Sequence, residues 1–381
     1  MTGNILIAGD LFPNEKNLAD FRAGAVDALF GEKLVGMFAN ADLTLCNLEG
    51  ALSDSGERGV KTGPVKVAPA DAVAAYRKLG VDVCLLANNH VTDGGAQGVR
   101  DTLKALAGAG IHAVGAGENE TLIPHSFVRE VGGVRFGFYN VSETMYNKPG
   151  RDVPGVWLYD EYVVCRELAE CKRSCDYLVV IYHGGIEKFP LPSPETRKRF
   201  YRMADNGADL IVAQHTHCVG CEERYHGSRL IYGQGDFLLK NFAPGLTDTG
   251  LLLELAVEDG QVDVRKHLVG VVDDKGVRYA EKQDFAAYDA RSAQVGDEDY
   301  VYRQLQKFCE GELRLYLTAF KSPSRLRVRL ARLFPKAYRK WLFGYRERDL
   351  RFALHTLRSE QNRETAIIGI QDLLQSGGYR R

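Results

Sequence analysis

The feature that most constrains the fold of this 381-residue chain is a short apolar run that ends abruptly in polar side chains, and it occurs five times. Runs of this length, rich in Val, Ile and Leu, are typical of buried strands. The five runs are residues 5–8, 43–48, 83–87, 177–182 and 210–213. Because ligands gather at the carboxyl ends of strands in α/β sheets, the repetition predicts one polar site built from all five ends.

The residues that follow these runs carry carboxylates, carboxamides and imidazoles. They are Asp10, Glu49, Asn88, Asn89, His90, His183, His215 and His217. Several have an ordinary alternative. The aspartate suits an Asx turn, the asparagines suit turn positions, and a His-x-His pair in isolation is most often a surface feature. Recurrence at five strand ends favours a shared site over these local explanations.

Segments with helical spacing separate or follow the runs, over residues 18–38, 69–79, 97–109, 159–174 and 194–206. This alternation predicts a layered α/β fold for residues 1–275, with a hairpin around Asp259-Gly260 near its end. Residues 295–381 are helical in character, and they are basic between Lys321 and Arg351. That region predicts contact with a membrane surface or a polyanion, or else a packed appendage whose arginines are merely solvated.

Charge and composition exclude several classes of function. The formal net charge is −1, so we expect no specific nucleic-acid binding. No window approaches 18 uninterrupted apolar residues, and the N-terminus lacks a charged and then apolar leader, so we expect neither a spanning helix nor a standard secretion signal. The eight cysteines favour a reducing cytoplasm. Cys218 and Cys221 form a CxxC pair, interpreted as core filling in preference to a zinc or redox site.

The polar residues at the strand ends form a ligand set for metal ions. Oxygen and imidazole ligands without an aligned thiolate suit Mn, Fe or Zn. Two divalent ions bridged by Glu49 would need about this number of ligands, and such a pair activates water and stabilises charge on a phosphoryl oxygen. Asp93 has two interpretations, as a helix cap or as the partner that orients His90.

Six ordered motifs between residues 4 and 268 carry a family resemblance. They are GD at 9–10, NLEG at 47–50, LANNHVTDGG at 86–95, GAGEN at 115–119, HGGIE at 183–187 and HTHCVGCEERYHGSRLIYGQGDF at 215–237. Together they resemble the CapA-type capsule and poly-gamma-glutamate synthesis proteins, a branch of the calcineurin-like metallophosphoesterases. The resemblance implies a four-layered α/β sandwich of two mixed β-sheets flanked by helices, followed here by a C-terminal helical appendage.

The resemblance also implies roles for individual residues. The implied ligands of two divalent metal ions are Asp10 and His217 for one, Asn89, His183 and His215 for the other, and Glu49 as the bridge. His90, supported by Asp93, would protonate the leaving oxygen as the catalytic acid. We expect Asn88, Glu187 and Asp236 to contact substrate.

Two positions depart from the family pattern. In the wider phosphoesterase pattern a metal-binding histidine stands two residues after the first aspartate, and here that residue is Phe12. The first metal site is then one ligand short, which predicts weaker binding, an extra water ligand or occupancy only with substrate. The usual GNF is GDF here, so Asp236 adds a carboxylate that offsets part of the missing ligation.

Together the ligand set and the resemblance predict a metal-dependent phosphoesterase-like hydrolase. Its substrate would be a small-molecule or polymer-precursor phosphoester in the biosynthesis of capsule, exopolysaccharide or poly-gamma-glutamate. We expect it in the cytoplasm, peripheral at the inner membrane face where the basic region binds. The alternative is a metal-binding accessory or scaffold protein of the assembly complex with little hydrolase activity, and Phe12 is the residue that favours it.

Overall fold

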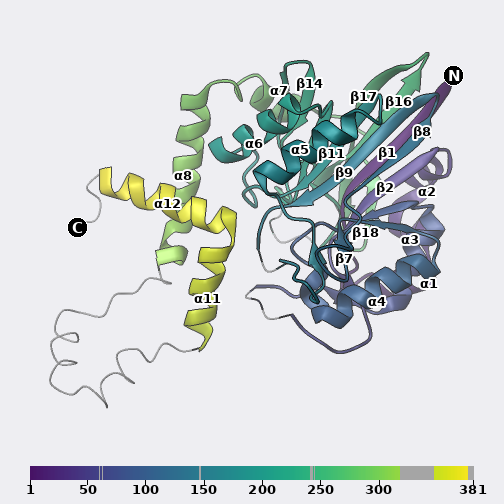
Figure 1. Ribbon diagram of the computed structural model, residues 1–381, viewed down its shortest axis with the longest axis horizontal. Helices are drawn as coiled ribbons and strands as arrows, with labels where there is room; N and C mark the ends of the chain where they lie inside the picture. The colour runs from purple at the N-terminus through teal and green to yellow at the C-terminus, as the bar shows by residue number, and fades with distance from the viewer. Residues whose placement is uncertain are drawn as a thin grey trace. The chain divides into compact units, whose positions relative to one another are not determined.

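Two mixed β-sheets and the helices beside them form the larger part of the protein in this computed structural model (Figure 1). The structure describes residues 1–59, 61, 63–145, 147–240, 243, 245–317 and 347–375. These residues form two compact units. The first runs to Tyr302 and the second starts at Arg303, with residues 61 and 63 grouped with the second.

The first sheet has eight strands in the order β18-β17-β16-β1-β2-β5-β6, with β15 paired to β1. Strands β1, β2, β5 and β6 are mutually parallel, β15 is parallel to β1, and β16, β17 and β18 are antiparallel to their neighbours. Their bounds are β1 Thr2–Leu11, β2 Leu43–Leu48, β5 Val83–Leu85, β6 His112–Val114, β15 Asp236–Leu238, β16 Thr249–Glu258, β17 Gln261–Val272 and β18 Gly276–Tyr279.

The second sheet has six strands in the order β13-β14-β12-β11-β9-β8. Its four central strands are parallel, and the two edge strands are antiparallel to their neighbours. The bounds are β8 Ser126–Val131, β9 Val134–Ser142, β11 Tyr177–His183, β12 Leu210–Gln214, β13 Glu222–Tyr225 and β14 Ser228–Ile231. Two short pairs complete the strands: β3 Ala51–Leu52 with β4 Val67–Ala68, and β7 Ala116–Gly117 with β10 Gly155–Val156.

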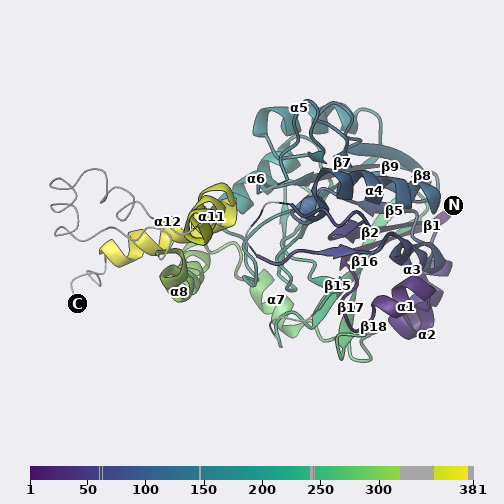
Figure 2. The same cartoon turned by 90° about the horizontal axis from the view of Figure 1, so that it is seen from below.

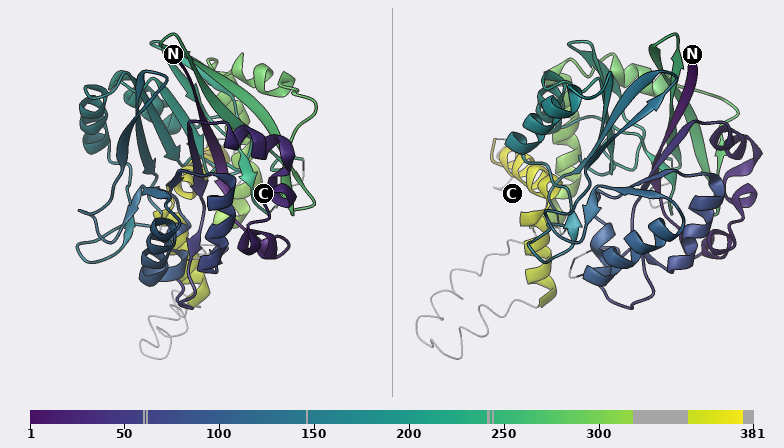
Figure 3. Two further views of the ribbon diagram at one scale, coloured as in Figure 1. Left: turned by 90° about the vertical axis from the view of Figure 1, so that its right-hand side faces the viewer. Right: turned by 45° about the vertical axis from the view of Figure 1, so that its right-hand side comes forward.

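Helices cover the outer side of each sheet. Figures 2 and 3 show α1 and α2 on one side of the strands and α5 and α6 on the other. The helices of the first unit are α1 Leu18–Ala23, α2 Val26–Ala39, η1 Ala70–Ala72, α3 Val73–Leu79, η2 Val91–Gly94, α4 Gly95–Gly108, α5 Glu161–Lys172, α6 Pro194–Asp205 and α7 Ala286–Ser292. The predicted four-layered α/β sandwich is therefore confirmed.

Strand alternation explains how the layers are held together. Successive side chains of a strand point to opposite faces, so Ile5 and Ile7 pack between the sheets with Phe138, whereas Leu6 and Ala8 face the helices. Burial on both faces is what makes such strands read as unbroken apolar runs. The two cores fix the relative position of the sheets, and with it the position of the strand ends.

Three details differ from the sequence expectation. The segment 18–38 contains two helices, because Gly24 ends α1 with φ 65°, and Gly31, with φ 72°, interrupts α2. The strand predicted at 83–87 is shorter, ending at Leu85. Strand β1 does not stop at residue 8 but continues to Leu11. A side chain at Gly9 would lie 2.4 Å from the backbone oxygen of Gly235, so the close approach of these two segments requires a glycine here.

The predicted hairpin is present between β16 and β17. Asp259 and Gly260 form its turn with φ 50° and 81°, the two positive values that a tight hairpin turn with an Asp-Gly step requires.

From Arg303 onward, the described part of the second unit is mainly helical. It contains most of α8 Glu298–Leu317, together with α11 Glu347–Arg358 and α12 Glu360–Gln375. A hydrogen bond of 3.1 Å joins Gln306 Nε2 to Asp372 Oδ1, and another of 2.9 Å joins Asn362 Nδ2 to His355 Nε2. Most of the basic segment from Lys321 onward, including Pro335, lies outside the described residues.

Candidate metal centre

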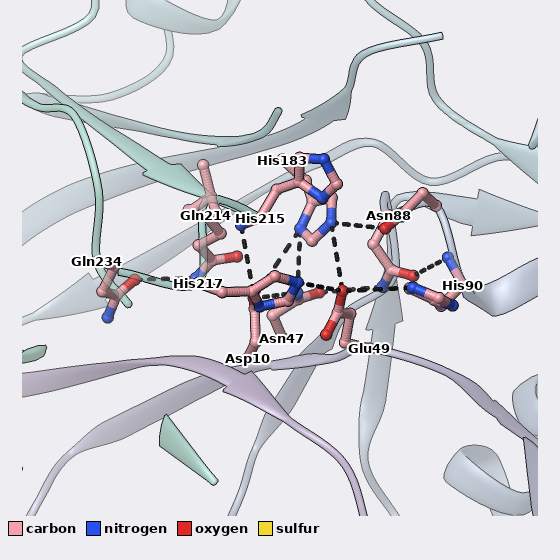
Figure 4. Close-up of polar contacts among 12 residues, drawn as sticks. Asp10, Asn47, Glu49, Asn88, His90, His183, Gln214, His215, His217 and Gln234 are labelled. Carbon is pink, nitrogen blue, oxygen red and sulfur yellow. Dashed lines mark hydrogen bonds and ion pairs between the residues drawn. The ribbon is translucent and has the colours of Figure 1, made fainter. Parts of the chain in front are cut away.

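The carboxyl ends of strands from both sheets meet at one buried polar cluster (Figure 4). Asp10 lies near the end of β1, Glu49 follows β2, His183 ends β11, and His215 and His217 follow β12. All five side chains are almost completely buried. Figure 4 shows them directed toward a common centre. The sheets thus bring together residues that lie up to 207 positions apart in the chain.

The turn that carries the two histidines has an unusual backbone. His215 and His217 have φ of 87° and 57°, a region that residues other than glycine seldom occupy and that is often seen at functional sites. The backbone N–H of His215 donates to Asp10 Oδ2 at 3.2 Å. Beside it, Gln214 Nε2 donates to Gln234 Oε1 at 2.9 Å, and Gln234 Nε2 donates to backbone oxygens of β1 and β16. These bonds tie the turn of one sheet to strands of the other.

Two overlapping groups have the spacing of metal ligands, with one atom of each residue within 4.8 Å of the others. One group is Asp10, His217 and Asp236, and the other is Glu49, His215 and His217. His217 Nδ1 lies 2.7 Å from Asp236 Oδ1 and 3.5 Å from Asp10 Oδ2. His217 Nε2 lies 3.7 Å from Glu49 Oε1. His217 therefore belongs to both groups, with Nδ1 toward the two aspartates and Nε2 toward Glu49.

The residues expected around a second ion lie next to these groups. His183 Nε2 is 3.0 Å from Asn89 Oδ1 and 3.9 Å from Glu49 Oε1. The rings of His183 and His215 have centroids 4.9 Å apart. Asn47 Nδ2 lies 3.2 Å from His183 Nδ1 and orients that ring. Asn89, His183 and His215 are thus neighbours, and their service as ligands stays a prediction.

Burial keeps two of the imidazoles neutral. Burial lowers the pKa of His215 to about 4, and the nearby His217 charge acts in the same direction. Burial, with the charges of His217 and Lys66, lowers the pKa of His183 well below its ordinary value. A neutral imidazole offers a lone pair, which is the form that binds a metal ion.

In the neighbouring ligand group, Asp10, His217 and Asp236, the pKa values are raised and not lowered. Burial and the Glu49 carboxylate raise the pKa of Asp10 to about 8. Burial alone would lower the pKa of His217, but the carboxylates of Asp236 and Glu49 outweigh it and raise that pKa to about 10. Burial also raises the pKa of Asp236, against the effect of His217. Without a metal ion, Asp10 and His217 therefore hold protons at neutral pH.

His90 and Asp93 form a buried pair beside the cluster. His90 Nδ1 lies 2.6 Å from Asp93 Oδ2, and His90 Nε2 lies 3.9 Å from Glu49 Oε1. Gly94, and not Asp93, is the cap residue of α4. Of its two interpretations, Asp93 has the position that orients His90, with the outer nitrogen of the ring turned toward the cluster (Figure 4).

The three residues expected to contact substrate lie in different surroundings. Asn88 uses its amide within the protein, accepting from the backbone N–H groups of His90 and Val91 and donating to Asn47 Oδ1 and to the backbone oxygen of Leu48. Its predicted contact with substrate stays a prediction.

Glu187 and Asp236 lie beside different histidines of the pair. Glu187 is 38% exposed and its Oε1 lies 3.8 Å from His215 Nε2, at the edge of the cluster. Asp236 is buried against His217, among the candidate metal ligands. Phe12 packs in the hydrophobic core, at 4% exposure, where it offers no ligand atom.

Lys66 is a member of the cluster that the strand-end pattern missed. Its Nζ forms an ion pair with Glu49 Oε2. Burial lowers the pKa of this ammonium, but the Glu49 carboxylate outweighs burial and raises the pKa above its ordinary value. The neighbouring residues in the sequence do not indicate that Lys66, and not the nearby Lys61, lies in the cluster. Only the pairing of β3 with β4 brings it to Glu49.

The CxxC pair lies outside both ligand groups. Cys218 and Cys221 are free and buried, and burial raises the pKa of each thiol to about 12. Metal binding and redox exchange both use the thiolate, so these thiols suit the predicted core-filling role.

The donor set fits divalent metal ions. Among the described residues, the buried atoms Glu49 Oε1, Asp236 Oδ2 and both ring nitrogens of His215 have no hydrogen-bond partner. Buried polar atoms are rarely left unsatisfied, and oxygen and imidazole donors suit Mn, Fe or Zn. Asp236 supplies a carboxylate beside Asp10, where Phe12 supplies none.

The fold and the site together define an α/β protein with a buried candidate metal centre at the carboxyl ends of its strands. Residues 4–241 match the family described as bacterial capsule synthesis protein PGA_cap. The chain belongs to this family, so the resemblance to CapA-type proteins is confirmed.

Named relatives agree with the family. The capsule biosynthesis protein CapA of Bacillus anthracis is 32% identical over 47% of this chain and 44% of its own length. A probable polyglutamine synthesis accessory protein of Mycobacterium tuberculosis is 33% identical over 51% of this chain and 55% of its own length. The PGA biosynthesis protein CapA of Bacillus subtilis is 32% identical over 47% of each chain. The chain thus spans about half the length of the curated relatives it matches.

A solved structure described as a novel phosphatase of Mycoplasma pneumoniae superposes with a TM-score of 0.44 at 14% identity, covering 76% of this chain and 99% of that chain. Superposition at this level does not by itself assign a function. Across the described helices, none combines the length and apolar character needed to cross a membrane.

Proposed function

We propose that the protein is a metal-dependent hydrolase of phosphoesters that acts in the making of a cell-surface polymer. The observation that carries the proposal is the pair of overlapping ligand groups joined at His217, with buried donor atoms left unsatisfied. Asp10, His217 and Asp236 would hold one divalent ion. His215, with His183 and Asn89 beside it, would hold the other, and Glu49 would serve both ions.

Bound at these residues, divalent ions supply an activated water and neutralise charge on the phosphoryl oxygens. The protein orients the ligands itself. Asn47 donates to Asp10 Oδ1 at 2.6 Å, and the strained turn after β12 fixes the two histidines. Buried and held before substrate arrives, these groups need little rearrangement during the reaction.

His90 is placed to deliver a proton. With Nδ1 bonded to Asp93, its Nε2 is the nitrogen that faces Glu49 and the cluster. In this geometry Asp93 fixes the ring, and the imidazole would act from Nε2 as the acid that protonates the leaving oxygen of the ester.

The pathway rests on the family and its relatives. Two of the named relatives are described as capsule or PGA biosynthesis proteins, which supports a polymer-precursor phosphoester as the substrate. A cytoplasmic location, and contact of the basic region with an anionic membrane surface or polyanion, belong to the same proposal. Most of that region lies outside the described residues.

The test is turnover of p-nitrophenyl phosphate by Mn²⁺-loaded protein, with metal content measured on the same samples. We expect hydrolysis by the wild type and by Lys282→Met, a matched control whose side chain is 85% exposed. Glu49→Ala should lose both bound metal and turnover. Bound metal without turnover on aryl phosphates and diphosphates would overturn the hydrolase. It would favour the accessory function, which the core position of Phe12 supports.

A further inference from the structure

Lys66 brings a positive charge into a cluster otherwise built from carboxylates, carboxamides and imidazoles. Its Nζ contacts Glu49 Oε2, and its charge also interacts with Asp10 and Asp236. The side chain therefore belongs to the centre itself and not to the surface around it.

The backbone of Lys66 is held in place from two directions. Its N–H donates to Asp93 Oδ2 at 2.7 Å, and its carbonyl oxygen accepts from the N–H of Ala51 at 3.0 Å. Asp93 is also the partner of His90, so one carboxylate positions both the lysine and the histidine. Lys66 and His90 thus lie beside Glu49 in a fixed relation to one another.

Lys66 lies on the solvent side of the cluster. Its side chain is 18% exposed, whereas that of Glu49 is 0% exposed and that of His217 is 4% exposed. Of these three side chains, that of Lys66 is the most accessible to a ligand from solvent. Its polar tip is an ammonium with three donors.

We propose that the Lys66 ammonium binds a non-bridging phosphoryl oxygen of the substrate, a phosphate ester. This inference rests on the hydrolase activity proposed above. Glu49 Oε1 has no hydrogen-bond partner among the described residues, and Oε2 holds Lys66. With Glu49 serving as a ligand of a divalent ion, the Lys66 ammonium would be released to turn its donors to an arriving anion. Lysine binds phosphate as a point charge, which fits one ammonium at the edge of the centre.

The test is calorimetric titration of the 381-residue chain, first with MnCl₂ and then, on the Mn²⁺-saturated protein, with inorganic phosphate. Lys66→Met keeps the apolar stem and removes the charge, Lys66→Arg keeps the charge, and Lys282→Met is the surface control. We expect Lys66→Met to weaken phosphate binding about tenfold to a hundredfold, the loss of one charge-assisted hydrogen bond. Its Mn²⁺ affinity should equal or exceed that of the wild type, because Glu49 no longer holds a competing cation. Lys66→Arg should keep most of the phosphate affinity.

Equal phosphate affinity in Lys66→Met and wild type would overturn the inference. So would loss of Mn²⁺ binding or a much lower melting temperature in Lys66→Met, because Lys66 would then serve only as the structural partner of Glu49. A wild type that binds Mn²⁺ but no phosphate refutes the role of Lys66 alone. A wild type that binds neither Mn²⁺ nor, in parallel titrations, Zn²⁺ or Fe²⁺ refutes the proposed hydrolase and this inference together, and the surface control shares that failure.

Discussion

Metal binding at Asp10, His217 and Asp236 should release protons, because metal ligands bind in their deprotonated forms. The pKa values of about 8 for Asp10 and about 10 for His217 leave both groups protonated at pH 7 in the metal-free protein. Simple titration with these values gives a release of about 1.9 protons per ion at pH 7, against about 0.2 for an aspartate and a histidine with ordinary pKa values. At pH 9 the release falls to about 1.0, because Asp10 is then mostly ionised.

The sign of the pH dependence follows from the same shifts. Apparent Mn²⁺ affinity should rise with pH by up to two logarithmic units per pH unit below pH 8, and by about one between pH 8 and 10. The stability of the metal-free protein should change in the opposite direction and fall as pH rises. A raised carboxyl pKa contributes stability that is present below about pH 4 and lost as pH rises through about 8.

Calorimetry in two non-phosphate buffers of different ionisation enthalpy measures the proton release directly. Asp236→Asn is the informative variant, since Asp236 Oδ1 lies 2.7 Å from His217 Nδ1 and helps keep that ring protonated. We expect it to lower the release at pH 7 by up to one proton. A wild-type release below about half a proton, or the same release in Asp236→Asn, would refute the reasoning about these buried charges.

Three further outcomes are expected. Glu49→Ala should lower metal content more than Asp10→Ala, since a bridging ligand serves both ions, and equal loss of one ion in the two variants, measured by metal analysis, would refute the bridge. His90→Asn should keep its metal while turnover falls roughly 10²–10⁴-fold. The loss should be larger for an alkyl than for an aryl leaving group, and rates on two such esters check the acid role. Gly115→Ala should lower the free energy of unfolding by roughly 1–3 kcal/mol, because φ is 96° and the new Cβ would lie 2.2 Å from a buried side-chain oxygen. Urea denaturation measures it, with Gly108→Ala, which meets no atom within 4 Å, as the control.

The polar ends of the apolar runs could be predicted from the sequence. Apolar runs such as 177–182 and 210–213 predict buried strands from neighbouring residues alone. The polar side chains that follow each run predict where the strand ends. The Asp259-Gly260 hairpin could also be predicted from local sequence, because its turn geometry depends on two adjacent residues. Because parallel strands place their carboxyl ends at one edge, Asp10 and Glu49, which lie at the ends of the neighbouring strands β1 and β2, are expected close together. His183 ends a strand of the other sheet, so it joins them only because the two sheets pack together.

Contacts within the site depended on packing. Asp236 reaches His217 because β15 lies beside β1, in a register that pairs Asp236 with Asp10. Asp93 could be a cap or a partner of His90 until the turn at 91–94 directed its carboxylate to the ring. A glycine is required at position 9 because the backbone oxygen of Gly235, more than two hundred positions along the chain, approaches it closely.

The sequence by itself determined the element types, the layer class and the chemical kinds of ligand, because strand alternation, turn chemistry and side-chain donors are properties of neighbouring residues. The tertiary structure alone decided which donors face one another, and it brought Lys66 to Glu49 and raised the pKa values of Asp10 and His217. Those outcomes depend on how two sheets pack and how deeply they bury each charge, and both are set by contacts between segments distant in the chain.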